Sequence, residues 1–134
     1  VSPDGPLRSL AAAVRQAPAG ARIVVRAGTY REGAPVLVDR PLTIEGEPGR
    51  FPTLDGGGAH EILRVAAPDV TLRGLRFTNV GVAMTEDRAA VRVGDTGGCV
   101  IEGNRFDDTF FGVYLGRVAG CVVRGNTFAG VPRG

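Results

Sequence analysis

The 134 residues of the chain predict an all-β solenoid, in which short parallel strands stack as successive coils. One five-residue phrase that ends in glycine is repeated along the chain. Its copies are Leu42–Gly46, Val70–Gly74, Cys99–Gly103 and Cys121–Gly125, and their glycines lie 28, 29 and 22 residues apart. A period of roughly 20 to 30 residues on short β-type runs is typical of stacked coils, so we expect about five of them.

A second family of apolar triplets supports the same architecture. Each triplet ends 8 to 10 residues before one of the glycines, and the four are Val36–Val38, Leu63–Val65, Val91–Val93 and Val113–Leu115. Ile23–Val25 opens the stack ahead of the first phrase. Each coil is therefore expected to carry about two or three short strands, with turns at Ala27–Tyr30 and Leu54–Gly58.

The repeated phrase alternates between apolar and charged positions. The residues four and two places before each glycine are apolar, and the residue just before it is charged: Glu45, Arg73, Glu102 and Arg124. Because successive side chains of a strand point to opposite faces, the apolar set faces the core and the charged set faces solvent. Stacked strands lie about 4.8 Å apart, so the alternating signs are expected to attract one another.

The residues around the glycines predict how the chain turns. We expect the glycines at bends where a Cβ would be unfavourable. Asn104 and Asn126 follow two of them, and stacked asparagines at a turn can form a hydrogen-bonded ladder. Three places after the later glycines come Phe77, Phe106 and Phe128, which we expect to point inward and stack along the core.

The segment Pro6–Ala17 is predicted to be a helix that covers the first coil. Asp4 or Gly5 can cap its start, and Pro18 and Gly20 end it. Its apolar stripe consists of Leu7, Leu10, Ala11 and Val14. A single amphipathic helix before a stack of strands is typical of the cap that shields the open end of a repeat array. The whole chain is then one domain, with a helical cap over residues 1–20 and coils over residues 21–134.

Composition excludes several classes of protein. The net charge is only +2, the 16 basic residues are all arginine, and they are scattered along the chain, which does not predict a nucleic-acid face. No run approaches the roughly 18 apolar residues of a transmembrane segment. The chain carries no signal peptide, but it begins abruptly at Val1, so a removed leader is compatible with the sequence.

With the coils laid out, the chain resembles the N-terminal part of a right-handed parallel β-helix of the pectate lyase-like superfamily. Pectate lyase-like, alginate epimerase-like and NosD-like chains share an opening like Leu7–Leu10 and Ala19–Tyr30. Two stretches are similar to the NosD repeat in particular: Leu54–Leu75, with its Asp-Gly-Gly-Gly and Ala-Pro-Asp-Val segments, and Gly103–Asn126, with its two Gly-Asn pairs. This resemblance implies a periplasmic or secreted, non-catalytic accessory protein. It would work with an ABC transporter and a copper chaperone in maturing the copper site of nitrous oxide reductase.

A carbohydrate-active β-helix, such as a polysaccharide lyase, epimerase or hydrolase whose catalytic coils lie beyond residue 134, is the alternative. A structural or adhesive β-helix of the tailspike kind is a third. Asp107 and Asp108 are the catalytic candidates, because paired carboxylates can act as general acid and base or bind calcium. We place them in a solvated turn, and the Asp-Pro-His-Glu tetrad of alginate epimerases is absent. Outward arginines could meet an anionic polysaccharide, but the glutamates among them favour an ordinary surface.

Cys99 and Cys121 occupy the same position in successive coils. A disulfide and a copper thiolate site are both open, but free and buried cysteines are the favoured interpretation. Both align with Leu42 and Val70, and in-register parallel neighbours suit a relaxed disulfide poorly.

His60 and Met84 are the metal-ligand candidates that remain, since soft ligands suit copper(I). They lie about 24 residues apart, which favours an exposed histidine and a packed methionine.

The last coil ends with an open strand edge. Val122, Val123 and Phe128 lie beside it, and no cap follows them in the sequence. We expect this edge to pair with further coils of a longer solenoid or with another copy of the chain, because an unpaired edge is a template for another strand.

Overall fold

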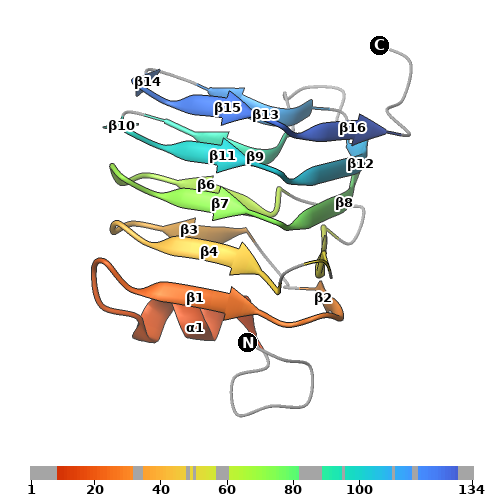
Figure 1. The fold of residues 1–134 in the computed structure, drawn as a ribbon, viewed down its shortest axis with the longest axis horizontal. Coiled ribbons are helices and arrows are strands. Elements are labelled where there is room, and N and C mark those ends of the chain that lie inside the picture. The colour runs from red at the N-terminus through yellow and green to blue at the C-terminus, as the bar shows by residue number, and fades with distance from the viewer. Residues whose placement is uncertain are drawn as a thin grey trace.

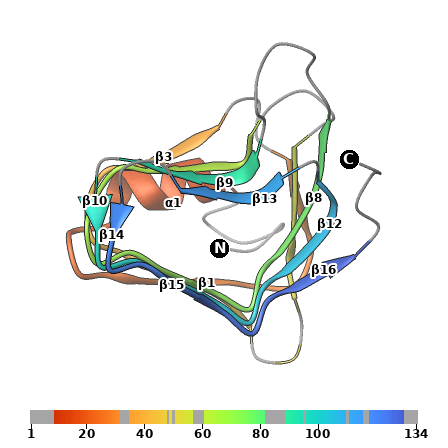
Figure 2. The same cartoon turned by 90° about the horizontal axis from the view of Figure 1, so that it is seen from above.

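The computed structural model describes residues 9–31, 35–47, 49, 51–56, 61–81, 89–94, 96–109, 111–115 and 118–129. Within these residues the chain winds into stacked coils whose strands form three large parallel sheets and one two-stranded sheet, with a helix beneath the first coil (Figure 1). Seen along the stack, the sheets enclose the core on three sides (Figure 2). The protein is a right-handed parallel β-helix with an N-terminal helix, as the sequence predicts.

The repeated glycine phrase forms sheet A, which has five strands. They are β1 (Arg22–Val25), β4 (Thr43–Gly46), β7 (Thr71–Arg73), β11 (Val100–Glu102) and β15 (Val122–Arg124), stacked in that order. The predicted alignment is also the observed register: Ile44 pairs with Leu72, Leu72 with Ile101, and Ile101 with Val123. The first three of these side chains are fully buried.

The apolar triplets form sheet C, which has four strands. They are β3 (Val36–Val38), β6 (Leu63–Val65), β9 (Ala89–Val93) and β13 (Phe111–Leu115). In β3 and β6 the outer residues of each triplet are buried and the central one is exposed. A short pair, β10 (Thr96–Gly97) and β14 (Val118–Ala119), lies at the corner before sheet A.

Sheet B contains strands that the sequence analysis had assigned partly to turns. Its members are β2 (Thr29–Arg31), β5 (Thr53–Asp55), β8 (Arg76–Gly81), β12 (Arg105–Thr109) and β16 (Thr127–Ala129). The turns expected at Ala27–Tyr30 and Leu54–Gly58 are therefore wrong where these ranges overlap β2 and β5. The physical reason is that Tyr30 and Leu54 point into the core and are buried between polar neighbours, as in a strand.

The phenylalanine stack is confirmed where the structure describes it. Phe77 and Phe106 are both fully buried, and their rings stack with centroids 5.0 Å apart and planes 12° from parallel. The backbone of Phe128 pairs with that of Phe106, while the Phe128 side chain lies outside the described part.

The helix α1 spans Leu10–Gln16 and covers the core beside β1 and β3. The Ser9 side chain accepts a hydrogen bond from the Ala12 N–H (3.2 Å) and caps the start of α1 at Leu10. The expected start at Pro6 and the expected caps, Asp4 and Gly5, lie outside the described residues. Leu10 and Val14 are buried. Arg40 donates from Nη1 to the carbonyls of Val14 (2.9 Å), Arg15 (3.3 Å) and Ala17 (2.8 Å), so it satisfies the last carbonyls of the helix.

The glycines of the phrase are needed for two different reasons. Gly74, Gly103 and Gly125 have φ of 66°, 62° and 63°, a left-handed conformation that side-chain-bearing residues rarely adopt. Gly46 instead needs space, since a Cβ there would overlap the carbonyl oxygen of Gly74. Both reasons confirm that the glycine row lies at a corner, between sheets A and B.

The asparagine ladder is present. Asn126 Oδ1 accepts from the Asn104 backbone N–H (2.9 Å) and from its Nδ2 (3.2 Å), and Asn104 Oδ1 accepts from the Leu75 N–H (3.0 Å). Asn104 is almost fully buried, and its Nδ2 also donates to the Leu72 carbonyl (3.0 Å). The amides therefore tie three successive coils together at the corner.

The two ends of the stack differ. At the first coil α1 covers the core, whereas Val122 and Val123 on β15 are 41% and 40% exposed. Their equivalents one rung below, Val100 and Ile101, are partly and fully buried. Nothing tests which strand covers this edge, so its pairing remains a prediction. Within the described ranges, no helix has the length and apolar character that a membrane crossing requires.

Candidate functional site

A shallow groove of about 530 Å³ runs along the corner between sheets A and B. We call it the corner groove. It crosses four coils, and each coil contributes a charged residue and the glycine that follows: Glu45 and Gly46, Arg73 and Gly74, Glu102 and Gly103, Arg124 and Gly125. Glycines leave the floor without side chains, so backbone forms the floor and the charged row forms one wall.

The charged row has the predicted alternation of sign. In the register Glu45 pairs with Arg73, Arg73 with Glu102, and Glu102 with Arg124. Glu102 forms ion pairs with both neighbours, with Arg73 Nη2 at 3.3 Å and with Arg124 Nε at 2.8 Å. Glu45 is paired with Arg22 of the coil below.

A second group of charges lies across the same corner, on sheet B. Arg76 and Arg105 are partners in the register, and Asp107 binds both: Oδ2 lies 2.6 Å from Arg76 Nε and 3.0 Å from Arg105 Nε. One carboxylate thus bridges two arginines that would otherwise repel each other. Between the first two coils, Arg31 of β2 pairs with Asp55 of β5 at 2.8 Å. The hydrogen bond with Asp55, and then its negative charge, raise the pKa of Arg31, so this guanidinium stays protonated.

A third group repeats the arrangement on sheet C. Arg64 and Arg92 are register partners, and Glu61 accepts from Arg64 Nε (3.1 Å) and from Arg92 Nε (2.8 Å). Only 6% of the Glu61 side chain is exposed. Among the described residues, each of the three large sheets therefore has a carboxylate that holds two arginines.

These groups share a direction: the guanidinium is outside and the carboxylate lies beneath it. The exposed fraction of the side chain is 68% for Arg124 and 25% for Glu102, and 51% for Arg105 and 12% for Asp107. The Asp39–Arg40 pair has the opposite order: 52% of the Asp39 side chain and 30% of the Arg40 side chain are exposed, because Arg40 turns toward the end of α1. The acidic neighbours were expected to make the surface ordinary, but the surface of these groups presents mainly arginine.

The catalytic candidates lie in a different place from the one expected. Asp107 and Asp108 belong to strand β12, so the prediction of a solvated turn is wrong. The strand continues because Asp107 is held by two arginines and pairs in register with Thr78. With both oxygens of Asp107 accepting from Arg105, its carboxylate acts as a structural acceptor here. The Asp108 side chain lies outside the described part.

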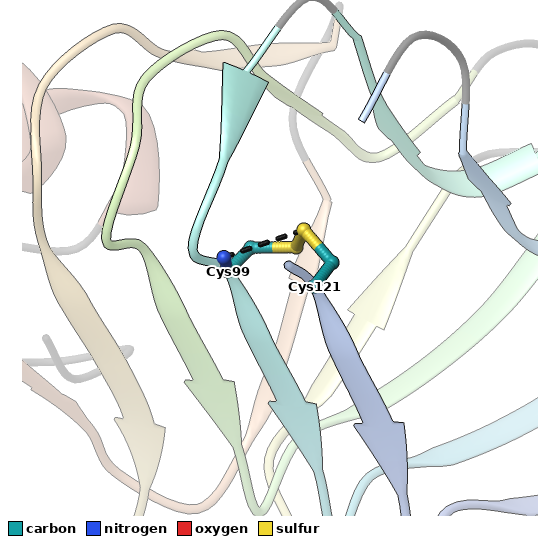
Figure 3. Close-up of a disulfide and its surroundings, with 2 residues drawn as sticks. All are labelled: Cys99 and Cys121. Atoms are coloured by element: carbon teal, nitrogen blue, oxygen red, sulfur yellow. Dashed lines mark hydrogen bonds between the residues drawn. A yellow bond between two sulfur atoms is a disulfide. The ribbon is translucent and has the colours of Figure 1, made fainter. Parts of the chain in front are cut away.

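The two cysteines form a disulfide, and this corrects the expectation that they are free (Figure 3). The predicted misfit does not apply, because both residues stand just before the first ladder pair, Val100 and Val122. Each follows a left-handed glycine, Gly98 or Gly120. Their Cα atoms approach to 4.4 Å, which lies in the roughly 4.4–6.8 Å range of disulfides. The Cys121 sulfur also accepts from the Cys99 N–H (3.3 Å).

The described residues do not fit a copper site. They contain no group of three or more histidine, cysteine, aspartate or glutamate side chains that could hold a metal ion. A disulfide removes the thiolates that a soft metal would need. His60 and Met84, the other metal-ligand candidates, lie outside the described residues.

Sequence reasoning found the charged row but missed the bridging carboxylates Glu61 and Asp107. A signal was available for Asp107. It follows Arg105 by two residues on the same face of the strand, and Arg105 aligns with Arg76 of the preceding coil. Glu61 lies three residues before Arg64. The role of Arg40 had no sequence signal, because its contacts with α1 depend on how the cap is placed over β3.

The geometry defines the class of protein as a right-handed parallel β-helix whose outer faces carry bridged arginine pairs. The chain is similar to a protein of Pseudomonas aeruginosa described as a probable ABC transporter binding protein, NosD. The two are 41% identical over 80 residues, which cover 59% of this chain and 18% of the relative. No protein-family model and no solved structure matches the chain.

Proposed function

We propose that the protein is a NosD-like, non-catalytic accessory protein that works with an ABC transporter in the periplasm. The observation that carries the proposal is the 41% identity to NosD, a probable ABC transporter binding protein. The shared region is 18% of that relative, so the transporter as partner is a proposal that rests on similarity over this region. The process we assign is maturation of the copper site of nitrous oxide reductase, with copper as cargo passed between partner proteins.

Two features of the structure support this proposal. Disulfides persist in oxidising compartments, so the Cys99–Cys121 bond favours a periplasmic or secreted location over the cytoplasm. Solenoids expose extended faces that are suited to binding other proteins. In the carbohydrate-active alternative the catalytic coils lie outside this chain, and within it the Asp107 carboxylate is paired with Arg76 and Arg105.

The experiment is a deletion of the gene in its own host, followed by complementation with the full-length protein. We expect the deletion strain to make nitrous oxide reductase that lacks its copper absorption and activity, and complementation to restore both. In parallel, the tagged full-length protein should retain the transporter components in a pull-down from solubilised membranes. A copper-loaded, active reductase in the deletion strain would refute the proposed process, and loss of growth on a uronate polymer would favour the carbohydrate reading.

A further inference from the structure

We propose that the corner groove binds an extended, carboxylate-rich segment of a partner protein, with Arg73 and Arg124 as its anchors. This inference deepens the proposed function and rests on it in one respect, the choice of a protein as the partner. The site itself follows from the shape, charge and exposure of the groove.

The groove is an open channel whose floor is smooth over four coils. Each coil contributes a glycine at the corner, so no side chain interrupts the floor between Gly46 and Gly125. Such a floor admits a chain running along the stack. A compact ligand would find no enclosed cavity here.

The exposed charge in the groove is positive. Arg124 and Arg73 are 68% and 47% exposed, whereas Glu45 and Glu102 are 12% and 25% exposed. A ligand that approaches from solvent therefore meets guanidinium groups first.

The guanidinium groups of the two anchors keep donors for a ligand. Arg73 contacts Glu102 through Nη2, and Arg124 contacts it through Nε. A guanidinium has five N–H donors, and each anchor contacts Glu102 through one nitrogen, so donors remain for a ligand within the described part of the chain. Their planar fork matches a carboxylate.

Positive charge continues across the corner. Arg76 and Arg105 begin strands β8 and β12, three places after Arg73 and Glu102 along the chain. Both side chains are about half exposed, and the Asp107 carboxylate between them is recessed. An acidic chain in the groove is thus flanked by arginine on both sheets.

A peptide fits this groove better than a sugar or a nucleic acid. The eight described residues that line the groove are all Glu, Arg or Gly, so this part of the chain brings no aromatic ring to it. Single-stranded nucleic acids gain much of their affinity from bases stacked on aromatic side chains, and sugar rings pack on aromatic faces in the same way. Carboxylates on a flexible peptide need only the guanidinium forks.

The test measures binding of a fluorescein-labelled oligoglutamate peptide to the full-length protein by fluorescence anisotropy, at low and at physiological ionic strength. We expect binding that weakens with salt, and the Arg73→Gln/Arg124→Gln variant to weaken it by about tenfold, since two exposed charge contacts are lost. The matched control is Arg31→Gln/Arg64→Gln. It removes the same charge from residues of similar exposure that lie outside the groove, and it should leave binding within about twofold.

A third variant separates binding from structural pairing. Glu102→Gln removes the recessed carboxylate and keeps both anchors, so it should tighten binding several-fold. Thermal unfolding of each variant confirms that it is folded. Equal weakening by the groove variant and the control, or no tightening by Glu102→Gln, would overturn the proposal.

Unlabelled oligogalacturonate in competition tests the alternative occupant. If it displaces the peptide at equal or lower carboxylate concentration, the groove is a sugar site and our choice of partner is wrong. These results are independent of the deletion experiment. If the deletion strain makes copper-free reductase but the protein does not bind the peptide, the proposed function stands and this site is refuted. If the reductase is copper-loaded but the peptide binds the groove, the site stands and the proposed function is refuted.

Discussion

The disulfide is expected to hold the last described coil against the stack. It joins the residues that precede β11 and β15, and the outer edge of β15 is the one where Val122 and Val123 are exposed. We therefore consider the double variant Cys99→Ala/Cys121→Ala. Alanine is chosen over serine because the side chain at position 99 is only 1% exposed, where a serine hydroxyl would be buried.

The expected magnitude follows from the loop that the bond closes. The two cysteines are 22 residues apart in sequence. In the chain-entropy model a loop of this length corresponds to about 3 kcal/mol of stability at 25 °C. Urea unfolding of small domains has a slope of about 1–3 kcal/mol per molar, so the midpoint should fall by about 1–3 M.

The location of the loss is a sharper readout than its size. In a solenoid each coil contacts only its neighbours, so the loss should concentrate at the end of the stack. Hydrogen exchange should show faster exchange in residues 118–129 of the variant and unchanged exchange in Thr43–Gly46. Wild-type protein treated with a reductant provides a second route to the same state. An unchanged urea midpoint in both, or equal acceleration in all coils, would refute the reasoning.

Three further predictions concern the corner and the core, and each is measured by urea unfolding. Phe106→Ala should lower the free energy of unfolding by about 3–5 kcal/mol, because a fully buried, stacked ring is lost; a loss below about 1 kcal/mol would contradict the stack. Asn104→Ala should lower it by about 1–3 kcal/mol, since the Leu75 N–H loses its buried acceptor, and an Asn104→Leu control that restores stability would argue against the ladder. Gly103→Ala should cost about 1–2 kcal/mol from its positive φ alone, and Gly46→Ala should cost more because its Cβ meets backbone; the reverse order would be inconsistent with this assignment.

Sequence reasoning was most successful where a pattern recurs in every coil. The glycine phrase predicted sheet A and its register, and the apolar triplets predicted sheet C. Sheet B was anticipated only through its phenylalanines. Its first two strands are three residues long and carry a single inward side chain, Tyr30 or Leu54, which is too little alternation to distinguish a strand from a turn.

The candidate site was less predictable, because it depends on contacts between coils. The signs of Glu102 and its neighbours could be read from the sequence, but their unequal exposure could not. The cysteine prediction failed for a related reason. Alignment with Leu42 and Val70 correctly predicted a core-facing position, with Cys99 1% exposed, but it could not show that the two backbones approach to 4.4 Å beyond the end of the ladder.

The unequal exposure of acids and bases has a simple physical origin. Adjacent rungs lie about 4.8 Å apart, and a carboxylate on a short stem stays near the sheet, where two rungs can reach it. The longer arginine stem lies over the neighbouring rung and keeps its charged end in water. A solenoid with nearly equal numbers of acids and bases can therefore expose mainly its arginines to solvent, as Arg124 and Arg105 show here. The net charge, only +2 in this chain, is therefore a poor guide to the partners it attracts, because attraction depends on which charges a partner meets first.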